Sequence, residues 1–597
     1  MSKPISEDEI RLIVVVEGDD PHKKMFKIAV HLQDDFFDVG IAIQELYWKI
    51  RQISIYDLSL YRGNVPFEQV EHVELSDEIL LLPSRLVASE WPSESDVDRR
   101  LVHIIVRAES RQITNTHKVI APPSAKTEFD KFIDDFNNAQ LDFVQTVKSK
   151  NSSSSAMPKH FRVQQSGPAY INIGRPAERT GLPIVLYHPV FGGFLTRLRS
   201  NDPIEPEVYL RTREHFLVSQ DLYEHENNNP RARDEATRTS LGGLLGNALQ
   251  KITVHGVQAD GVITGRDATP LMIMEMKNEI GAGSSDPSIQ AAQSYTRYWS
   301  SAGARHWLNW CCCPSILIAI AGPWMCVLGA VFLKRPVIQP LTHFLWIGND
   351  PTQPSELGYI SRVFDCLFQA RVELEDYYRT SSPPTLGQNP VRPFPYLVHY
   401  LDSMGQRVDF TYRKVLCPNN SKKQIFLAET IDTEKPRYIV VKFVQKYNAD
   451  AHKLLAENKL APELLYNGTA HPEEQPGPEH AMIVMDFVHG VDLQEWSISS
   501  PLSRSAFNDI DTAVKLLHNH NFVFGDLREP NVMILQDSIG RATGRAMLID
   551  FDWCGEHLEG RYPLKMNTTL GWHPGVGLGA VMDKQHDLHM LKTLASI

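Results

Sequence analysis

The sequence predicts a multidomain protein of mixed α+β and α/β architecture, and three observations carry this prediction. The chain has 597 residues, about four times the size of a typical domain. Its 42% hydrophobic and 22% charged residues are typical of globular proteins and exclude a chain that is disordered throughout. The net charge of −12 is unevenly spread, since residues 1–110 carry −9 of it. Successive blocks of the chain therefore need separate interpretation.

Two separators divide the chain. Residues 151–155 are polar and rich in serine, which predicts a flexible linker, and residues 381–395 are rich in proline, which predicts a stiffer one. We assign 1–110 to a first domain, 111–180 to a linker with the Ser-rich segment, 181–378 to a second domain, 379–395 to a Pro-rich linker and 396–597 to a third domain.

Composition also excludes several classes of protein. The seven cysteines, three of them adjacent at 311–313, form no spaced pairs, which argues against a disulfide scaffold or a zinc finger and fits a reducing compartment. A pI near 6.0 argues against binding nucleic acid by bulk charge. Residues 316–333 carry no charge and only just reach spanning length, and Gly322-Pro323 in their middle favours two buried strands over a transmembrane helix. Residues 1–9 lack the apolar core of a secretory signal peptide.

The first block alternates strand-like and helix-like patterns. Strands are predicted at 10–17, 26–32, 58–62 and 101–107, with a hairpin turn at 18–21. Apolar residues recur at helical spacing after Asp38, a candidate N-cap, at Val39, Ile43, Leu46 and Ile50. This order resembles a ubiquitin-like β-grasp, and with the LSLYRG segment at 58–63 it resembles the ubiquitin-like N-terminal domain of Crinkler-type effectors of fungi and oomycetes. The LFLAK-type signature of the oomycete members is absent.

The middle block has charged residues at defined positions of two predicted strands. Asp260 lies in the strand at 258–263, and Glu275 and Lys277 end the strand at 271–277. Side chains at i and i+2 of a strand share a face, so Glu275 and Lys277 point together and Asp260 on the neighbouring strand can meet them. Two carboxylates can hold a divalent ion that polarises a phosphodiester, while the ammonium stabilises developing charge. The set therefore predicts metal-dependent phosphodiester hydrolysis.

This D…ExK pattern resembles the PD-(D/E)XK nuclease fold, with Ala259 where the motif usually has proline. The resemblance implies a restriction-endonuclease-like α/β/α domain. A predicted helix with Glu235 precedes the strands, where the family often has another metal carboxylate, and Asp234 and Glu226 are nearby rivals. The alternative is that Glu-x-Lys is an ordinary pattern of a surface strand.

Two flanking features agree with the nuclease resemblance. The helix predicted after the strands resembles the Q-x-x-x-Y-like element and carries Gln290, Gln293, Tyr295 and Arg297. A basic cluster near Glu235 would permit contact with phosphates, the alternative being a solvated helix face. It consists of Arg231, Arg233 and Arg238.

The last block has the most specific motif of the chain. Asp526 and Asn531 have the D-x-x-x-x-N spacing of a phosphotransferase catalytic loop, and Asp550 follows a predicted strand like a metal-binding aspartate. In this chemistry Asp526 orients the acceptor hydroxyl, and Asn531 and Asp550 hold Mg²⁺. Lys442 in the strand at 438–443 resembles the lysine that binds the α- and β-phosphates of ATP.

The surroundings of this motif resemble a two-lobed kinase fold with a short C-lobe. Residues 482–488 resemble the hinge that holds adenine, and Asp587 resembles the aspartate that buttresses the catalytic loop. Gly525 stands where the usual arginine would precede Asp526, as in small-molecule kinases and fungal-type protein kinases.

Two departures from the kinase pattern concern the phosphate site. The expected Gly-rich loop is missing at 415–421. No helix-C glutamate is obvious, and Asp450 and Glu457 are the candidate partners of Lys442.

The three blocks together resemble Crinkler effectors that combine a ubiquitin-like N-terminal domain with nuclease-like and kinase-like domains. The resemblance implies a protein that is secreted without a recognisable signal peptide and acts in the nucleus of a host cell, or otherwise is cytoplasmic or nuclear. It implies DNA and host proteins as partners, Mg²⁺ or Mn²⁺ and ATP as cofactors, and no membrane span.

Three functions compete at this point. The first is a Mg²⁺-dependent DNA endonuclease coupled to a kinase-like regulatory domain, and the second is a protein phosphotransferase with a non-catalytic nuclease-like fold. The third is a catalytically silent scaffold. The sequence favours the first, because the set of Asp260, Glu275 and Lys277 is complete while the kinase-like block lacks its Gly-rich loop.

Overall fold

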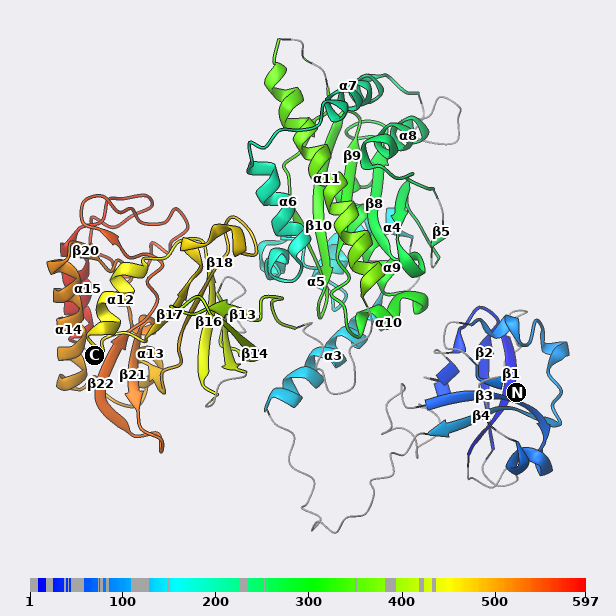
Figure 1. Cartoon of the computed structure of the whole chain (residues 1–597), viewed down its shortest axis with the longest axis horizontal. Helices are drawn as coiled ribbons and strands as arrows, with labels where there is room; N and C mark the ends of the chain where they lie inside the picture. The colour runs from blue at the N-terminus through cyan, green and yellow to red at the C-terminus, as the bar shows by residue number, and fades with distance from the viewer. Residues whose placement is uncertain are drawn as a thin grey trace. The chain divides into compact units, whose positions relative to one another are not determined.

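A computed structural model describes most of the chain. The described residues are 9–17, 25–36, 39–40, 42–43, 58–73, 75, 79–81, 85–108, 128–147, 151–224, 233–251, 253–254, 256–348, 350, 352–381, 393–417, 423–431 and 436–596. The chain divides into two compact units, Met1–Ala125 with Ser300–His306 and Lys126–Trp299 with Trp307–Ile597. Both units contain sheets and helices, so the predicted multidomain fold of mixed α/β class is confirmed (Figure 1).

The first unit is built on a four-stranded sheet in the order β2-β1-β4-β3. Its strands are β1 (Glu9–Val16), β2 (Phe26–His31), β3 (Leu58–Pro66) and β4 (Leu101–Ala108). The first and last strands run parallel at its centre, and the other pairs are antiparallel, which is the strand order of a β-grasp. Alternate residues of β1 pack into two different apolar clusters, one on each face of the sheet.

The helix predicted after Asp38 is only partly described. Val39 and Ile43 are helical and fully buried against the sheet. Asp38, Leu46, Ile50 and the turn at 18–21 lie outside the described residues.

Helices occupy the described part of the stretch 111–180 that the sequence predicts to be a linker. They are α3 (Glu128–Thr146), α4 (Ser152–Ser155) and α5 (Pro158–Ser166). The prediction of a flexible Ser-rich segment is wrong, because the Asn151 side chain caps α4 by accepting a hydrogen bond from Ser154 N at 2.7 Å. Ser152 is buried, and α4 packs against α9 (Pro287–Trp299). A polar composition did not prevent this short segment from joining the core.

A six-stranded sheet forms the centre of the middle block, in the order β11-β10-β9-β8-β7 with β12 paired to β10. The strands are β7 (Gly261–Thr264), β8 (Pro270–Lys277), β9 (Ser315–Ala321), β10 (Trp324–Phe332), β11 (Pro336–Pro340) and β12 (Leu345–Trp346), with a separate pair β5 (Thr253–Val254) and β6 (Val257–Gln258). The parallel pair β8 and β9 is joined through α9. All eight residues of β8 and all seven of β9 are buried, so both faces of the sheet are covered.

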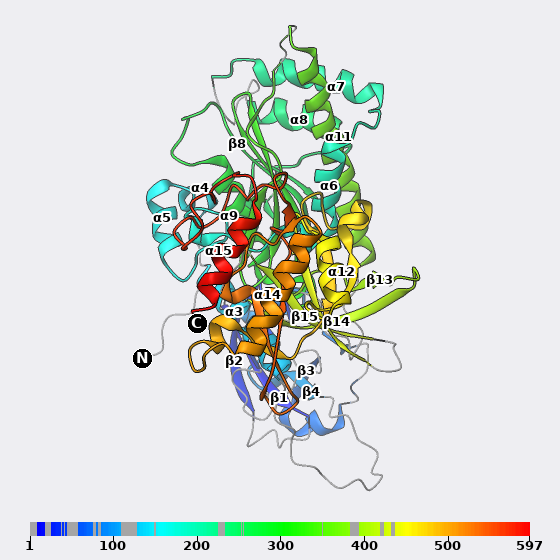
Figure 2. The same ribbon diagram turned by 90° about the vertical axis from the view of Figure 1, so that its left-hand side faces the viewer.

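Helices supply that cover. The strands β8 and β9 are contacted by α9 and by α11 (Pro354–Thr380). Three further helices pack on α11, namely α6 (Pro189–Arg199), α7 (Pro206–Gln220) and α8 (Arg233–Leu245), and the short α10 spans Arg305–Leu308. The sheet lies between α9 and α11 in the view of Figure 2, which gives the α/β/α layering.

The predicted pair of buried strands at 316–333 is confirmed. β9 and β10 form an antiparallel hairpin that turns at Gly322, whose φ is +56°. None of the helices in the described part of the chain has the length and apolar character needed to cross a bilayer.

The Pro-rich linker predicted at 379–395 is shortened at both ends, because its first residues belong to a helix and a residue near its end is buried. The helix α11 continues to Thr380, and Phe394 is buried and stacks on Tyr412 with 5.4 Å between ring centroids. Residues 382–392 lie outside the described part.

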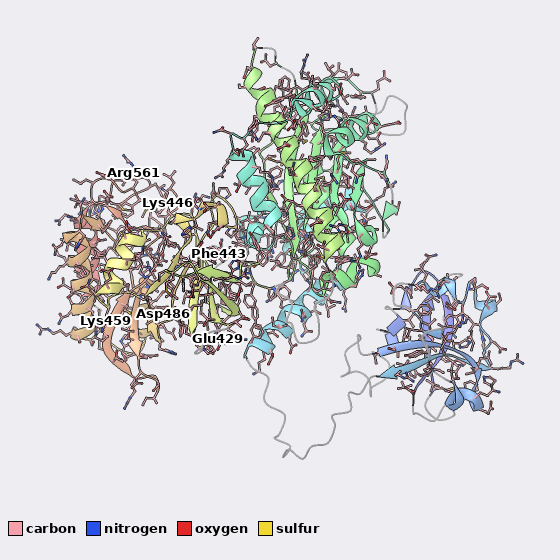
Figure 3. The ribbon with its side chains drawn as sticks, viewed as in Figure 1. Glu429, Phe443, Lys446, Lys459, Asp486 and Arg561 are labelled. Atoms are coloured by element: carbon pink, nitrogen blue, oxygen red, sulfur yellow. The ribbon has the colours of Figure 1, made fainter. Side chains whose placement is uncertain are left out.

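The smaller lobe of the kinase-like block is a six-stranded antiparallel sheet in the order β13-β14-β15-β16-β18-β17. Its elements are β13 (His399–Leu401), β14 (Arg407–Val415), β15 (Gln424–Thr430), β16 (Tyr438–Val444), α12 (Ala449–Glu457), β17 (Leu464–Asn467) and β18 (Ala481–Asp486). Figure 3 labels Glu429 and Asp486 on this sheet, which form ion pairs with Arg413 at 2.8 Å and with Arg437 at 3.2 Å.

The larger lobe combines helices with short strand pairs. Its elements are β19 (Gly490–Asp492), α13 (Leu493–Trp496), α14 (Arg504–Asn519), β20 (Phe522–Val523), β21 (Val532–Gln536), β22 (Ala542–Leu548), β23 (Gly555–Glu556) and α15 (Lys584–Leu594). One apolar cluster joins α12 of the smaller lobe to α14, β21, β22 and α15 of the larger lobe. The predicted two-lobed arrangement is therefore present.

Within this cluster His452 is held neutral. Its ring stacks on Phe551 at 4.5 Å, and its two nitrogens bond the Tyr447 hydroxyl and the Pro462 carbonyl at 2.8 and 2.9 Å. Burial lowers the pKa of His452 from 6.5 to about 4. The unfolded chain therefore binds a proton between these pH values that the folded chain does not.

We predict that stability falls as the pH drops from 6.5 toward 4 and that His452→Gln removes part of this loss. The shift in pKa corresponds to about 3 kcal/mol. Urea unfolding at about pH 7.5 and about pH 5 measures it, with His520→Gln, which changes an exposed histidine, as the matched control. Equal pH dependence in wild type and His452→Gln would contradict the prediction. His188 and His215, whose pKa values are also lowered by burial, add a dependence of the same sign that persists in His452→Gln.

Candidate functional site between the kinase-like lobes

The loop that follows β20 places Asp526 in a buried position. Asp526 is 5% exposed. Arg528 holds its carboxylate with two hydrogen bonds, one of them from Nη2 to Oδ2 at 2.7 Å. Asn531 Nδ2 donates to Oδ2 at 2.7 Å and to the Asp526 carbonyl at 2.9 Å. One rotamer of the Asp526 side chain is therefore fixed from two sides.

Asp587 in the first turn of α15 holds the backbone of the same loop. Its carboxylate accepts hydrogen bonds from Phe524 N at 2.8 Å and Gly525 N at 2.9 Å, and His518 Nε2 lies at 3.0 Å. Gly525 has φ of +80°, a conformation that side chains disfavour, which accounts for glycine immediately before Asp526.

Lys442 on β16 points from the smaller lobe to the larger one. Its Nζ lies 2.7 Å from Asp550 Oδ1 and 2.5 Å from Asp552 Oδ1. Lys423 Nζ lies 3.6 Å from the other oxygen of Asp550. The predicted Lys442 and Asp550 are thus brought together, and Asp552 joins them.

The prediction that Asp450 or Glu457 partners Lys442 is wrong. Both residues are exposed, and the buried positions of α12 within its helical turns are Ala449, Ala451, His452 and Leu455. Asp450 and Glu457 lie on the solvent-facing side of α12. The larger lobe therefore supplies the carboxylates that pair with Lys442.

The two aspartates share one ammonium, and their proton affinities separate. Burial would raise the pKa of Asp550, but the Lys442 charge and its hydrogen bond outweigh this and lower the pKa to about 2. Burial raises the pKa of Asp552 to about 7, with the charge of Asp550 adding to the effect and Lys442 opposing it. Burial would lower the pKa of Lys442, but the two carboxylates raise it. Asp550 is therefore the more acidic of the two carboxyl groups.

Asn531 and Asp550 are neighbours through the backbone, and together they fit a divalent ion. Ile549 N donates to the Asn531 carbonyl at 3.0 Å. Asn531 is 1% exposed, and its Oδ1 is a buried oxygen with no hydrogen-bond partner among the described residues. An amide oxygen beside an ionised carboxylate is a ligand pair that Mg²⁺ accepts. No group of three or more His, Cys, Asp or Glu side chains in the described part could hold a metal, so further ligands would come from phosphate and water.

Two segments that we expect to contact the nucleotide lie beside this site. Residues 482–488 include most of β18, which pairs with β16 beside Lys442. Of the loop at 415–421, residues 418–421 lie outside the described part. Lys423 directly follows this region and brings a cation to Asp550.

The middle block places its predicted residues on one face of its sheet. β7 and β8 are antiparallel with Gly261 opposite Met274, so one step further Asp260 lies opposite Glu275. Asp260 Oδ2 accepts a hydrogen bond from Met276 N at 2.9 Å. Lys277 is 7% exposed and follows Glu275 at the i+2 position. The three predicted residues are therefore together.

Glu275 is buried and is held by α9. Gln290 Nε2 donates to Oε2 and Ser294 Oγ to Oε1, each at 2.5 Å. Burial, followed by the charge of Asp260, raises the pKa of Glu275 well above its usual value, although Ser294, Lys277 and Gln290 act in the opposite direction. Glu275 therefore holds a proton more tightly than an exposed glutamate does.

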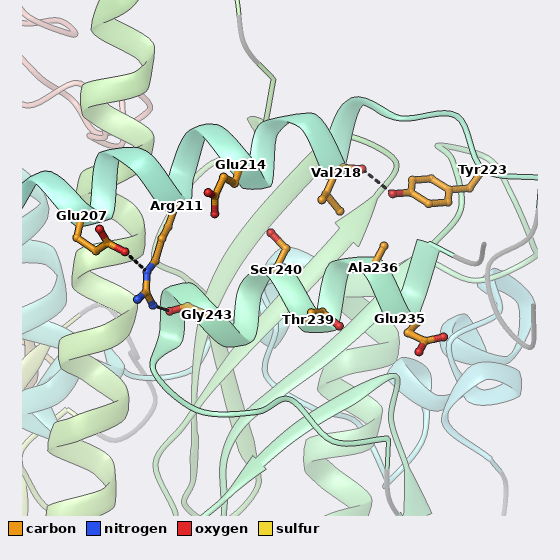
Figure 4. Close-up of a pocket in the computed structure, with 10 residues that line it drawn as sticks. All are labelled: Glu207, Arg211, Glu214, Val218, Tyr223, Glu235, Ala236, Thr239, Ser240 and Gly243. Atoms are coloured by element: carbon orange, nitrogen blue, oxygen red, sulfur yellow. Dashed lines mark hydrogen bonds and ion pairs between the residues drawn. The ribbon is translucent and has the colours of Figure 1, made fainter. Parts of the chain in front are cut away.

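The structure does not place Glu235 with this set. Glu235 lines a groove of 780 Å³ between α7 and α8, together with Glu214 and Arg211 (Figure 4). Asp234 points to the interior instead, where Arg238 and Lys251 each bind its Oδ2 at 2.9 Å. Successive residues of a helix differ by about 100° in direction, so Glu235 and Asp234 face different surroundings, and Glu235 as a metal ligand stays a prediction from sequence.

The basic cluster on α8 is not a solvated phosphate-binding face either. Arg233 is 1% exposed and donates to the carbonyls of Ser219 and Asp221 at 2.9 Å each. Arg238 pairs with Asp234 and donates to the Asp260 carbonyl at 3.1 Å. Arg231 lies outside the described residues. These arginines stabilise the fold around Asp260.

On α9, Gln290 contacts Glu275 of the predicted set. The other residues that the sequence analysis named on this helix have different partners. Gln293 Nε2 donates to Gln164 at 2.7 Å, and the Tyr295 hydroxyl donates to the Cys313 carbonyl at 2.8 Å. Ser294, which sequence reasoning missed, is one helical turn after Gln290, and that spacing is the signal that could have found it.

The kinase-like lobes together with the loop at Asp526 and the site at Lys442 define a kinase-like fold. No protein-family model and no curated protein matches the chain. Among solved structures, the chain is similar to the kinase PK-1 of Cydia pomonella granulovirus, with 18% sequence identity over 31% of this chain and 69% of that one and a TM-score of 0.26.

We predict that Asp587→Ala destabilises the loop that carries Asp526, because the backbone amides of Phe524 and Gly525 become buried donors without an acceptor. The cost is about 3 kcal/mol. Hydrogen exchange at these two amides measures it, and the expected result is faster exchange at both. Asp583→Ala is the control, since Asp583 only caps α15 and its loss costs about 1 kcal/mol. Protection of both amides at the wild-type level in Asp587→Ala would contradict the role given to Asp587.

Proposed function

We propose that residues 396–597 bind ATP with Mg²⁺ and transfer its γ-phosphoryl group to a hydroxyl of a protein. The observation that carries the proposal is the buried Oδ1 of Asn531, which has no hydrogen-bond partner within the described part of the chain. The carbonyl of the same residue accepts a hydrogen bond from Ile549 N, directly before Asp550. A buried polar oxygen without a partner is costly unless a ligand binds it. The chain therefore bears this cost at the position where a metal ligand is needed.

Each residue has a defined task in this proposal. Asp526, fixed by Arg528 and Asn531, accepts the proton of the acceptor hydroxyl and orients it. Lys442 binds phosphate oxygens, and Asn531 and Asp550 would hold Mg²⁺. When bound, the metal would neutralise charge on the phosphoryl group.

We predict that Mg²⁺ with ATP raises the unfolding midpoint of the full-length wild type and that Asp550→Asn and Lys442→Met abolish this gain. At 100 times the dissociation constant, binding adds about 2.7 kcal/mol. Thermal unfolding measures binding, and transfer of labelled phosphate to protein substrates measures the reaction. Asp526→Asn should bind nucleotide and lose transfer. Asp511→Asn, which changes a half-buried residue of α14 paired with Lys515, is the control. Absence of any Mg²⁺- and ATP-dependent gain in the wild type would overturn the proposal.

A second candidate is metal-dependent cleavage of DNA by the middle block. The approach of Asp260, Glu275 and Lys277 on one sheet face favours it, as does the bond from Gln290 to Glu275. Burial and the charge of Asp260 raise the pKa of Glu275, and a cation bound between the two carboxyls would oppose that rise.

We predict that supercoiled plasmid is nicked by the full-length protein with Mg²⁺ or Mn²⁺ and that Asp260→Ala and Lys277→Ala abolish nicking. Glu235→Ala is a matched control and should retain nicking, because Glu235 lies on the groove between α7 and α8. Intact plasmid after incubation with folded wild type and either metal would eliminate this candidate.

The Crinkler-type resemblance, and with it secretion and action in a host nucleus, remains a prediction from sequence. A β-grasp-like first unit supports it. Confinement of the tagged protein to the producing cell throughout colonisation would contradict it.

A further inference from the structure

A buried ammonium needs a permanent counter-charge, and Lys442 has two carboxylates. Its side chain is 8% exposed, with Asp550 Oδ1 at 2.7 Å and Asp552 Oδ1 at 2.5 Å. The helix next to it offers none, because Asp450 and Glu457 on α12 are exposed and its buried positions carry alanine, histidine and leucine.

The backbone around Phe551 directs both aspartates to the same cation. Phe551 is fully buried, and its ring meets His452 at 4.5 Å and Phe524 at 5.5 Å. With Phe551 fixed in the core, the residues on either side of it both reach Lys442. The register of Asp552 is therefore set by the packing of its neighbour.

Asp550 and Asp552 would have different partners once nucleotide and metal are bound. Asp550 also contacts Lys423 and is the carboxylate assigned to the metal with Asn531. When it turns to the metal, Lys442 loses one of its two partners, and Asp552 is the acid that stays with it. We propose that Asp552 is a positioning residue that holds Lys442 for the phosphates of the nucleotide, in place of the helix-borne acid that α12 lacks. This inference rests on the proposed phosphotransfer function.

The proposal predicts how the site fails without Asp552. In Asp552→Asn the ammonium keeps Asp550 as its remaining carboxylate, so Lys442 is drawn toward Asp550 and away from the nucleotide phosphates whether or not a metal is bound. Loss of one charge-assisted contact changes affinity about tenfold.

The test measures ADP binding to the full-length protein by calorimetry with EDTA and then with Mg²⁺, together with KM and kcat for ATP. Asp552→Asn should weaken metal-free ADP binding and raise KM about tenfold, with kcat changed less. Asp552→Glu keeps the charge and should recover most of the affinity. Asp550→Asn should keep metal-free binding and lose the gain from Mg²⁺. Glu457→Gln is the matched control and should bind like the wild type.

Each contrary result has a separate meaning. Metal-free binding by Asp552→Asn at the wild-type level, combined with loss of the Mg²⁺ gain, would make Asp552 a metal ligand and overturn the proposal. If Asp552→Asn matches the wild type in ADP binding with EDTA, in ADP binding with Mg²⁺ and in KM and kcat, the positioning role of Asp552 is also overturned. The phosphotransfer function would remain intact in that case. A wild type that binds no nucleotide would overturn the phosphotransfer function and this inference with it.

Discussion

The charge of Lys442 constrains the kinase-like block more than any other group. An ammonium that is 8% exposed cannot stay ionised without nearby carboxylates. Its partners come from a segment more than a hundred residues later in the chain, after β22 of the larger lobe. The sheet of the smaller lobe and the loop of the larger lobe must therefore meet for either to be stable. The same contact assembles the parts that phosphotransfer requires.

The middle block also contains a buried ionisable group, Glu275, but stabilises it with neutral hydrogen-bond donors. Glu275 is 1% exposed, and neutral donors on α9, not cations, satisfy its oxygens. Burial and the charge of Asp260 raise the pKa of Glu275, whereas Lys442 lowers the pKa of Asp550. An arriving cation therefore meets neutral donors at Glu275 and an ammonium at Asp550.

The sequence predicted those features that depend on local pattern. The loop from Asp526 to Asn531, the Asp260–Glu275–Lys277 set and the β9–β10 hairpin follow from spacing within short segments. The sequence did not predict features that depend on helix phase or on burial. Glu235 lies on the groove between α7 and α8 while its neighbour Asp234 is buried, and the Ser-rich run at 151–155 became a capped helix that packs against α9. Asp552 was missed because it lies outside the motif positions on which the kinase-like resemblance rests, although its partner Lys442 was among them.

The β9–β10 hairpin has a consequence for how the chain folds. Its strands are almost continuously apolar, carry no charge and are buried along nearly their whole length. Such segments pair with other chains when exposed. The parallel pairing of β8 with β9 has to wait for the α9 crossover, and non-local pairing of this kind is slow. Newly made chains thus pass through an interval in which self-association competes with folding, and truncations within α9 or α11 would prolong that interval indefinitely.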